Sequence, residues 1–157
     1  MIYPFRPSPT MPTPAYPSGV IYRPEIPIWI GVPGGRRFPF VGLLDTGSDD
    51  TKLPLSAVER LGVTVDLKHP IWFRGVGGLA RGHYGDVVPE LRQSPRSWIW
   101  SAKVAFLPEA EGERHERVRG EVILGHAGFF RHFHASFDFQ RGRARLRPNG
   151  LFVGLRS

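Results

Sequence analysis

The stretch that decides the fold is Phe40-Val41-Gly42-Leu43-Leu44-Asp45-Thr46-Gly47-Ser48-Asp49-Asp50-Thr51. An apolar run ends at a carboxylate, which is followed by a hydroxyl residue and a glycine. A short apolar run bounded by turn residues predicts a buried strand, which would carry Asp45 to a dry and rigid place. Because Gly47 has no Cβ, backbone amides can approach the carboxylate there. The same residues also favour a plain turn, since an aspartate can bond to its own backbone, so this stretch alone leaves both interpretations open.

The composition favours one domain built mainly of strands. The chain has 157 residues, of which 41% are hydrophobic, and this is enough for one compact core. Glycine and proline contribute 19 and 16 residues, a content that favours strands joined by turns over long helices. The absence of cysteine excludes a disulfide scaffold, a thiol nucleophile and a cysteine-ligated zinc site.

Apolar alternation and turn residues predict the order of the elements. A short helix over 56–61 would end at Gly62, and a second helix over 128–133 would point Phe129, Phe130 and Phe133 inward. The charged segment 109–119 is expected to be an exposed loop. Strands are expected over 26–30, 38–44, 71–73, 81–91, 98–107, 121–125, 135–139 and 143–147.

The first 24 residues differ from the rest because they contain seven prolines. Proline fixes φ and removes an amide donor, so this segment is predicted to be an extended, polyproline-like arm. We expect the folded domain to span 25–157 and the arm over 1–24 to be a linker or to lie on the surface or on a partner subunit, with a recognition tail for a proline-binding module as the alternative. Deletion of residues 1–20 should then leave the fold intact.

The charge is strongly basic, with a formal net charge of +7. Arg141, Arg143, Arg145 and Arg147 alternate with other residues, so in a strand they would share one face. Such a ridge can bind acidic partners or can simply keep an edge strand soluble. Because no aromatic residues interleave with these arginines, nucleic acid is not the expected partner.

No segment is expected to enter a membrane. The longest apolar run, 38–44, is far shorter than the roughly 20 residues that a spanning helix needs. The first residues lack a basic segment followed by an apolar one, so no secretion signal is expected and a cytoplasmic location is the default.

Two further motifs give the Asp45 stretch a context. A glycine-rich segment, Arg74-Gly75-Val76-Gly77-Gly78, follows it, and a second apolar run, Val122-Ile123-Leu124-Gly125, comes later. In order and spacing the three motifs resemble the retropepsin family, the single-domain aspartic proteases related to retroviral proteases. The resemblance covers roughly 26–147. It implies a mainly β, acid-protease half-barrel with a glycine-rich flap hairpin and one or two short helices.

The resemblance also implies roles for individual residues. Asp45 matches the catalytic aspartate, the Thr46 hydroxyl matches the group that bonds to the loop of a partner subunit, and the Gly47 amide matches the donor that orients the carboxylate. Asp49 and Asp50 match acidic positions that meet the substrate backbone.

The glycine-rich segment and the residue after Gly125 are matched in the same way. Residues Gly75, Val76, Gly77 and Gly78 match the flap tip that folds over a bound peptide. One position departs from the family pattern: retroviral members often place an arginine after the second glycine as a tether to an acidic residue, and this chain has His126.

A single Asp-Thr-Gly motif demands two copies of the chain. Aspartic protease chemistry uses two carboxylates about 3 Å apart that share one proton. Asp66, Asp86 and Asp138 lie in other contexts, so the second carboxylate is expected to be Asp45 of another copy in a twofold homodimer. The expected activity is a cofactor-free aspartic endopeptidase that binds a peptide or protein substrate as an added strand.

Position alone suggests which apolar residues serve substrate and dimer. Ile71, Val76 and Leu79 are candidate pocket walls, with cleavage expected between bulky apolar residues. The apolar segment 151–155 is a candidate dimer interface.

Other functions are weaker readings of the same residues. A dimer of this fold that binds peptides without cleaving them is the main alternative, and the intact Asp45-Thr46-Gly47-Ser48 motif argues against it. His132, His134 and His126 are more simply surface or helix-end histidines than metal ligands, so no metal is expected. The glycine-rich segment lacks the helix and lysine that a phosphate loop requires.

Overall fold

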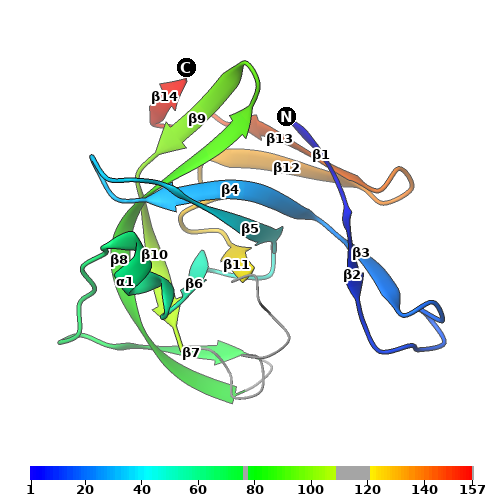
Figure 1. Cartoon of the computed structure of the whole chain (residues 1–157), viewed down its shortest axis with the longest axis horizontal. Coiled ribbons are helices and arrows are strands. Elements are labelled where there is room, and N and C mark those ends of the chain that lie inside the picture. The colour runs from blue at the N-terminus through cyan, green and yellow to red at the C-terminus, as the bar shows by residue number, and fades with distance from the viewer. Residues whose placement is uncertain (76–77, 109–120, 157) are drawn as a thin grey trace.

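The structure is a computed structural model that describes residues 1–75, 78–108 and 121–156 (Figure 1). Strands dominate these ranges, and the helix within them is α1 (Ala57–Leu61). The mainly β class predicted from the sequence is therefore confirmed. The strands are β1 (Ile2–Pro4), β2 (Arg6–Pro9), β3 (Val20–Arg23), β4 (Glu25–Gly31), β5 (Phe38–Leu44), β6 (Lys52–Pro54), β7 (Ile71–Gly75), β8 (Gly78–Gln93), β9 (Arg96–Trp100), β10 (Ala102–Leu107), β11 (Glu121–Leu124), β12 (Phe133–Asp138), β13 (Arg143–Pro148) and β14 (Gly154–Arg156).

The largest sheet has the order β10-β6-β11-β5-β4-β8-β9-β14, and β7 also pairs with β8. Because β10 pairs with β8 as well as with β6, this sheet closes on itself. The long strand β8 makes the closure possible, since it pairs in turn with β7, β10, β4 and β9. Apolar side chains at most 2% exposed form the core, among them Ile26, Ile28, Ile30, Leu53, Leu91, Trp100, Phe106, Val122, Leu124, Phe129 and Phe133.

The strand that leads to Asp45 lies between two others. β5 pairs antiparallel with β4 and parallel with β11, with Leu44 opposite Leu124. Beyond that pair the ladder continues by one bond, in which the Asp45 amide donates to the Leu124 carbonyl at 3.1 Å. β5 and β11 run in the same direction, so both of the segments that follow them, at Asp45 and at Gly125, emerge at the same edge of the sheet.

One of the two predicted helices is present. Helix α1 ends at Gly62, whose φ of 67° is the left-handed cap conformation expected for a glycine there. It buries Ala57 and Leu61 against the core.

The second predicted helix, over 128–133, is wrong. Gly128 has a φ of 87°, which no right-handed helix contains, and the amides of Phe130 and Arg131 donate to carbonyls five residues back. The segment is a series of turns that leads into β12. Phe129 and Phe133 nevertheless point inward and stack with ring centroids 5.1 Å apart, so the aromatic spacing predicted burial but not the backbone.

The strand predicted over 98–107 is divided in two. Both β9 and β10 pair with β8 in one continuous register, in which Leu91 lies opposite Trp98 and Val87 opposite Ala102. The division falls at Ser101, where the outer neighbour changes from β14 to β6. The segment predicted as a loop over 109–119 lies outside the described residues.

The first residues contribute strands and core side chains to the fold. β1 pairs with β13 in a three-stranded sheet of order β1-β13-β12, and β2 pairs with β3. Tyr3 and Phe5 are only 7% exposed and belong to the core. Proline is compatible with such short edge strands because these leave amide positions unpaired. The boundary between residues 1–24 and 25–157 stays a prediction.

The arginine ridge has the predicted alternation on β13. Arg145 and Arg147 are exposed, while the alternate residues Ala144 and Leu146 are buried. The strand lies between β1 and β12 rather than at an edge, because both of its sides are paired. Arg141 precedes the strand and bonds to Asp138, so it does not belong to the ridge.

Candidate active site

The Asp45 loop is a compact turn around one carboxylate. The Gly47 amide donates to Asp45 Oδ1 at 2.9 Å, and the Ser48 amide donates to the Asp45 carbonyl at 3.2 Å. The Ser48 side chain is buried and its hydroxyl donates to the Asp50 carbonyl at 2.8 Å. The turn therefore fixes one oxygen of the Asp45 carboxylate through a backbone donor, the arrangement that an approach through Gly47 allows.

The segment after β11 is joined to this loop by backbone hydrogen bonds. The His126 amide donates to the Ser48 carbonyl at 2.9 Å, and the Ala127 amide donates to the Asp49 carbonyl at 2.8 Å. These bonds join two segments that lie far apart in the sequence. The loop is thus held along its length by backbone contacts and does not depend on its own turn alone.

Gly125 allows the two segments to approach. A Cβ on this residue would lie 2.6 Å from the Ser48 carbonyl oxygen and closer still to that of Asp50. Since real Cβ atoms do not occupy such positions, only glycine fits here without moving the backbone. The Gly125 amide donates to the buried Thr51 hydroxyl oxygen at 3.2 Å, which closes the contact.

The loop lies at the surface of the single chain. Asp45 is partly exposed, and Thr46 and Gly47 are exposed. The single chain therefore does not give the carboxylate the dry surroundings expected for it, because the loop follows the end of β5 and lies at the surface. Among the residues that the structure describes, no cation forms an ion pair with Asp45.

The two acidic residues after the loop have different surroundings. Asp49 is exposed, whereas Asp50 is partly buried and accepts a hydrogen bond at 3.1 Å from the Tyr84 hydroxyl of β8. Burial, and next the charge of Asp50, raises the pKa of the Tyr84 phenol, so this hydroxyl stays a donor. The sequence analysis missed Tyr84, since its meeting with Asp50 depends on the register of β8 and leaves no local signal.

The hairpin of β7 and β8 carries the glycine-rich segment. Gly75 pairs with Gly78 at its end, and the positions between them, Val76 and Gly77, lie outside the described residues. Leu79 is 62% exposed, as is Trp72 at 64%, so the hairpin presents apolar side chains to its surroundings. The candidate pocket residue Ile71 is partly buried.

Two contacts connect this hairpin to the loop segment. The Phe73 ring of β7 lies edge-on to the Tyr84 ring at 6.2 Å, and the ammonium of Lys52 lies 5.7 Å from the centre of the Phe73 ring. Together with the bond from Tyr84 to Asp50, they place the base of the hairpin beside the segment that follows Asp45.

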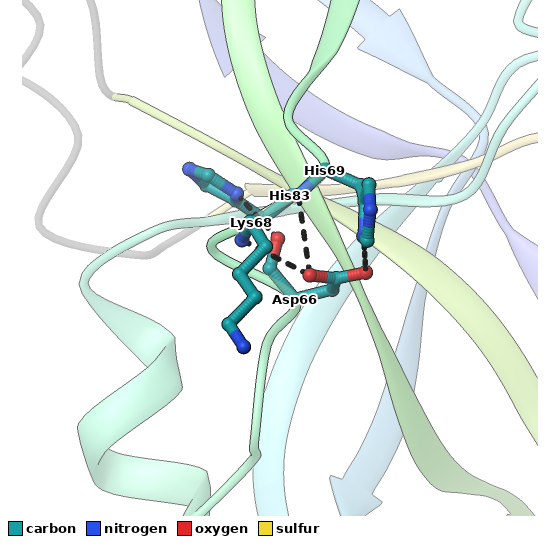
Figure 2. Close-up of polar contacts among 4 residues, drawn as sticks. All are labelled: Asp66, Lys68, His69 and His83. Carbon is teal, nitrogen blue, oxygen red and sulfur yellow. Dashed lines mark hydrogen bonds and ion pairs between the residues drawn. The ribbon is translucent and has the colours of Figure 1, made fainter.

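A polar cluster fixes the turn that leads into β7, as Figure 2 shows. Asp66 Oδ1 accepts from the amides of Lys68 and His69 at 3.0 and 3.2 Å, and Oδ2 lies 2.8 Å from His69 Nδ1. His83 of β8 lies with its Nδ1 2.9 Å from the Asp66 carbonyl oxygen, so its Nδ1 must donate. The hydrogen bond from His69 is the main cause that lowers the pKa of the Asp66 carboxyl. The sequence analysis did not predict this cluster.

The carboxylate of Glu90 lies near the turn of the β4–β5 hairpin, at the end opposite to Asp45. Glu90 of β8 is 6% exposed and accepts from Arg92 Nε and Nη2, each at 2.8 Å. Arg37 Nη1 lies 3.7 Å from Glu90 Oε2, and the Arg92 guanidinium lies 4.5 Å from the centre of the Trp29 ring. The hydrogen bonds from Arg92 lower the pKa of the Glu90 carboxyl. This is a charged group neutralised within the chain.

Within the described residues, the histidines do not gather into a metal site. His132 packs against Trp100 and Phe152, whereas His134 is exposed on β12. The described ranges hold no group of three or more histidine, aspartate or glutamate side chains able to bind a metal ion. They also contain no helix long and apolar enough to cross a membrane.

The structure thus brings Asp45, Thr46, Gly47, Asp49 and Asp50 together in one loop, with the base of the glycine-rich hairpin beside it. The roles of these residues stay predictions.

Comparison with known proteins adds little to these contacts. No family model matches the chain, and no curated protein matches it. Among solved structures the chain is similar to that described as EIAV protease complexed with the inhibitor HBY-793, with 22% identity and a TM-score of 0.45, over 66% of this chain and 82% of that one. Similarity at this level assigns neither a family nor an activity to the chain.

Proposed function

We propose that the chain is an aspartic endopeptidase of the retropepsin type, whose active site forms between the Asp45 residues of two copies. The observation that carries the proposal is the state of the Asp45 carboxylate. One oxygen accepts from the Gly47 amide, and the described residues offer no cation to neutralise the group. Such a carboxylate is oriented but remains able to share a proton with another.

The chemistry follows from two carboxylates that share one proton. The ionised carboxylate takes a proton from a water molecule while the water oxygen bonds to the scissile carbonyl carbon. The protonated carboxylate donates to the carbonyl oxygen, which gains negative charge. The first carboxylate then gives the proton that it took from water to the nitrogen, the bond from carbon to nitrogen breaks, and the two peptide fragments leave. Water is the only co-reactant in this scheme.

The exposure of the loop supports a second copy. Thr46 and Gly47 are exposed in the single chain, and a partner loop across a twofold axis would cover them and exclude water. The sequence holds one Asp-Thr-Gly motif, so a partner is the source of the second carboxylate. Activity should therefore fall steeply when the protein is diluted below the dimer dissociation constant.

The substrate in this proposal is an extended peptide that lies between the loop and the β7–β8 hairpin. Asp49 and Asp50 would meet its backbone, and residues 75–78 would cover it. The exposed Leu79 side chain offers apolar surface for a peptide side chain, which favours cleavage beside bulky apolar residues.

The test is cleavage of a mixed peptide library across a range of pH, with the parent protein and Asp45→Asn side by side. Asp86→Asn is the matched control, because Asp86 is an exposed carboxylate outside the loop that already pairs with Lys103 at 3.1 Å. We expect cleavage by the parent and by the control, and none by Asp45→Asn. Equal cleavage by parent and Asp45→Asn would contradict the proposal, and peptide binding by a parent dimer without cleavage would identify a silent binding module.

A further inference from the structure

The imidazole of His126 makes a contact with the Asp45 loop that the proposed function does not use. Its Nε2 lies 2.8 Å from the carbonyl oxygen of Thr46, the residue next to Asp45. A carbonyl oxygen only accepts hydrogen bonds, so Nε2 must carry the proton and donate it. The contact therefore selects one tautomer of the neutral ring, and it is also compatible with the protonated ring.

The peptide unit that receives this bond is the one that orients the carboxylate. The Thr46 carbonyl and the Gly47 amide belong to the same peptide plane, which is rigid and holds the two groups in opposite directions. The Gly47 amide in turn donates to Asp45 Oδ1 at 2.9 Å. A donor that fixes the carbonyl thereby fixes the direction of the amide, and bonds in such a chain strengthen one another.

The ring itself is held in place. The His126 amide donates to the Ser48 carbonyl at 2.9 Å, so the backbone of this residue is attached to the same loop as its side chain. The Phe130 ring lies edge-on to the imidazole with centroids 5.9 Å apart. The Phe130 amide donates to the Gly125 carbonyl at 3.1 Å, which secures the turn that carries the ring.

We propose that His126 is a positioning residue, which holds the Thr46–Gly47 peptide so that its amide points at the Asp45 carboxylate. The inference rests on the proposed function for its effect on catalysis, although the contact itself is independent of any reaction. Because Nε2 carries a proton in this neutral tautomer and in the protonated ring alike, the bond does not depend on the charge of the ring. A tether between an arginine and a carboxylate would instead weaken as the carboxylate is protonated.

The first test compares His126→Gln and His126→Leu. The glutamine variant retains a side-chain N–H donor at a similar reach, whereas the leucine variant has none. His134→Leu is the matched control, because His134 is an exposed histidine on β12 away from the loop. We expect His126→Leu to lower kcat about tenfold, equal to about 1.4 kcal/mol, with KM little changed, because one neutral hydrogen bond is lost. His126→Gln should restore kcat to within about threefold of the parent, and the control should match the parent.

The second test needs no cleavage. Backbone relaxation of the Gly47 amide should give an order parameter of about 0.85 in the parent and in His126→Gln, and below about 0.6 in His126→Leu. The nitrogen shifts of the neutral His126 ring should report a proton on Nε2. If the parent cleaves no peptide, the proposed function fails, while these two signals still decide the role of His126. The inference is overturned if both variants keep the parent's Gly47 order parameter, if both lose it equally, or if the neutral ring carries its proton on Nδ1.

Discussion

Two carboxylates with opposite surroundings lie on the strands that flank β4, one near each end of it. At one end Glu90 lies across from Trp29, buried and bound by two hydrogen bonds from Arg92. At the other end β5 leads to Asp45 at the surface, where the amide of Gly47 donates to its carboxylate. The same sheet therefore holds one negative charge that is neutralised and one that is not.

The difference shows what each carboxylate is suited to do. A buried carboxylate between arginines cannot easily change its charge, since a proton would break the ion pair, so Glu90 fixes the packing of β8 on β4. Asp45 is held in direction by a neutral donor, which leaves its charge available for chemistry. If Glu90 lost its arginine partners, the fold would lose stability. If Asp45 gained such partners, the proposed activity would be lost.

The largest expected effect is on cleavage by Asp45→Asn. Because both copies carry the substitution, both carboxylates of the proposed pair are lost, and kcat/KM should fall by about a thousandfold or more. The unfolding free energy should change by less than about 0.5 kcal/mol, because the surface carboxylate carries no ion pair. Peptide cleavage and urea denaturation of the same sample check both parts. A loss of stability as large as the loss of activity would mean that Asp45 is a structural residue like Glu90.

The converse substitution, Glu90→Gln, should affect stability and not chemistry. It leaves Arg92 and Arg37 without their carboxylate, and we expect a loss of about 2–3 kcal/mol in unfolding free energy, at the low end for a buried pair because Arg92 is partly exposed. The kcat of the proposed cleavage, per folded chain, should stay within about twofold of the parent, since Glu90 lies away from the loop. Asp86→Asn, with its exposed ion pair, should cost less than about 1 kcal/mol and serves as control.

Acid should remove the contribution of Glu90 to the free energy of unfolding. The pKa of Glu90 is lowered in the folded state by the hydrogen bonds from Arg92, so the unfolded chain binds more protons as the pH falls. The stabilisation is complete above the ordinary glutamate pKa of about 4.3 and is lost as the pH falls through the lower folded value. Urea denaturation between neutral and acidic pH should show this decline. In Glu90→Gln the decline should be shallower, and identical slopes in the two proteins would contradict the assignment.

The smallest expected effect is that of Tyr84→Phe. The variant keeps the edge-on contact with Phe73 and loses the hydrogen bond to Asp50. We expect the peptide KM to rise about twofold to fivefold with kcat nearly constant, and a loss of stability below about 1 kcal/mol. Steady-state kinetics on one library peptide checks the first part. A fall in kcat without a change in KM would place Tyr84 with the residues that orient Asp45.

Part of this arrangement is predictable because it depends on local chemistry. The apolar run into Asp45, the glycine that admits an amide to the carboxylate, and the second apolar run before Gly125 are properties of consecutive residues. The alternation of apolar residues likewise predicted β4, β5, β11 and β13 within one or two residues.

The rest depends on which strands lie side by side. Tyr84 reaches Asp50, and Glu90 reaches Arg37, only through the register of β8, which no short stretch of sequence encodes. The pairing of Tyr3 with β13 and its burial could not be predicted for the same reason, because the prolines around Tyr3 indicate the local backbone conformation and not the neighbouring strand. Gly128 set the backbone of the segment predicted as a second helix, against the helical spacing of its aromatic residues.

The close approach at Gly125 has a consequence for mixtures of good and damaged chains. Alanine at this position would place a methyl group against the backbone of Ser48 and Asp50, so the Asp45 loop would have to shift. In the proposed homodimer, equal amounts of parent and alanine chains that pair at random would leave about one pair in four with two unaltered loops. In the proposed homodimer, a chain with this one added methyl group would therefore also lower the activity of the unaltered chains with which it pairs.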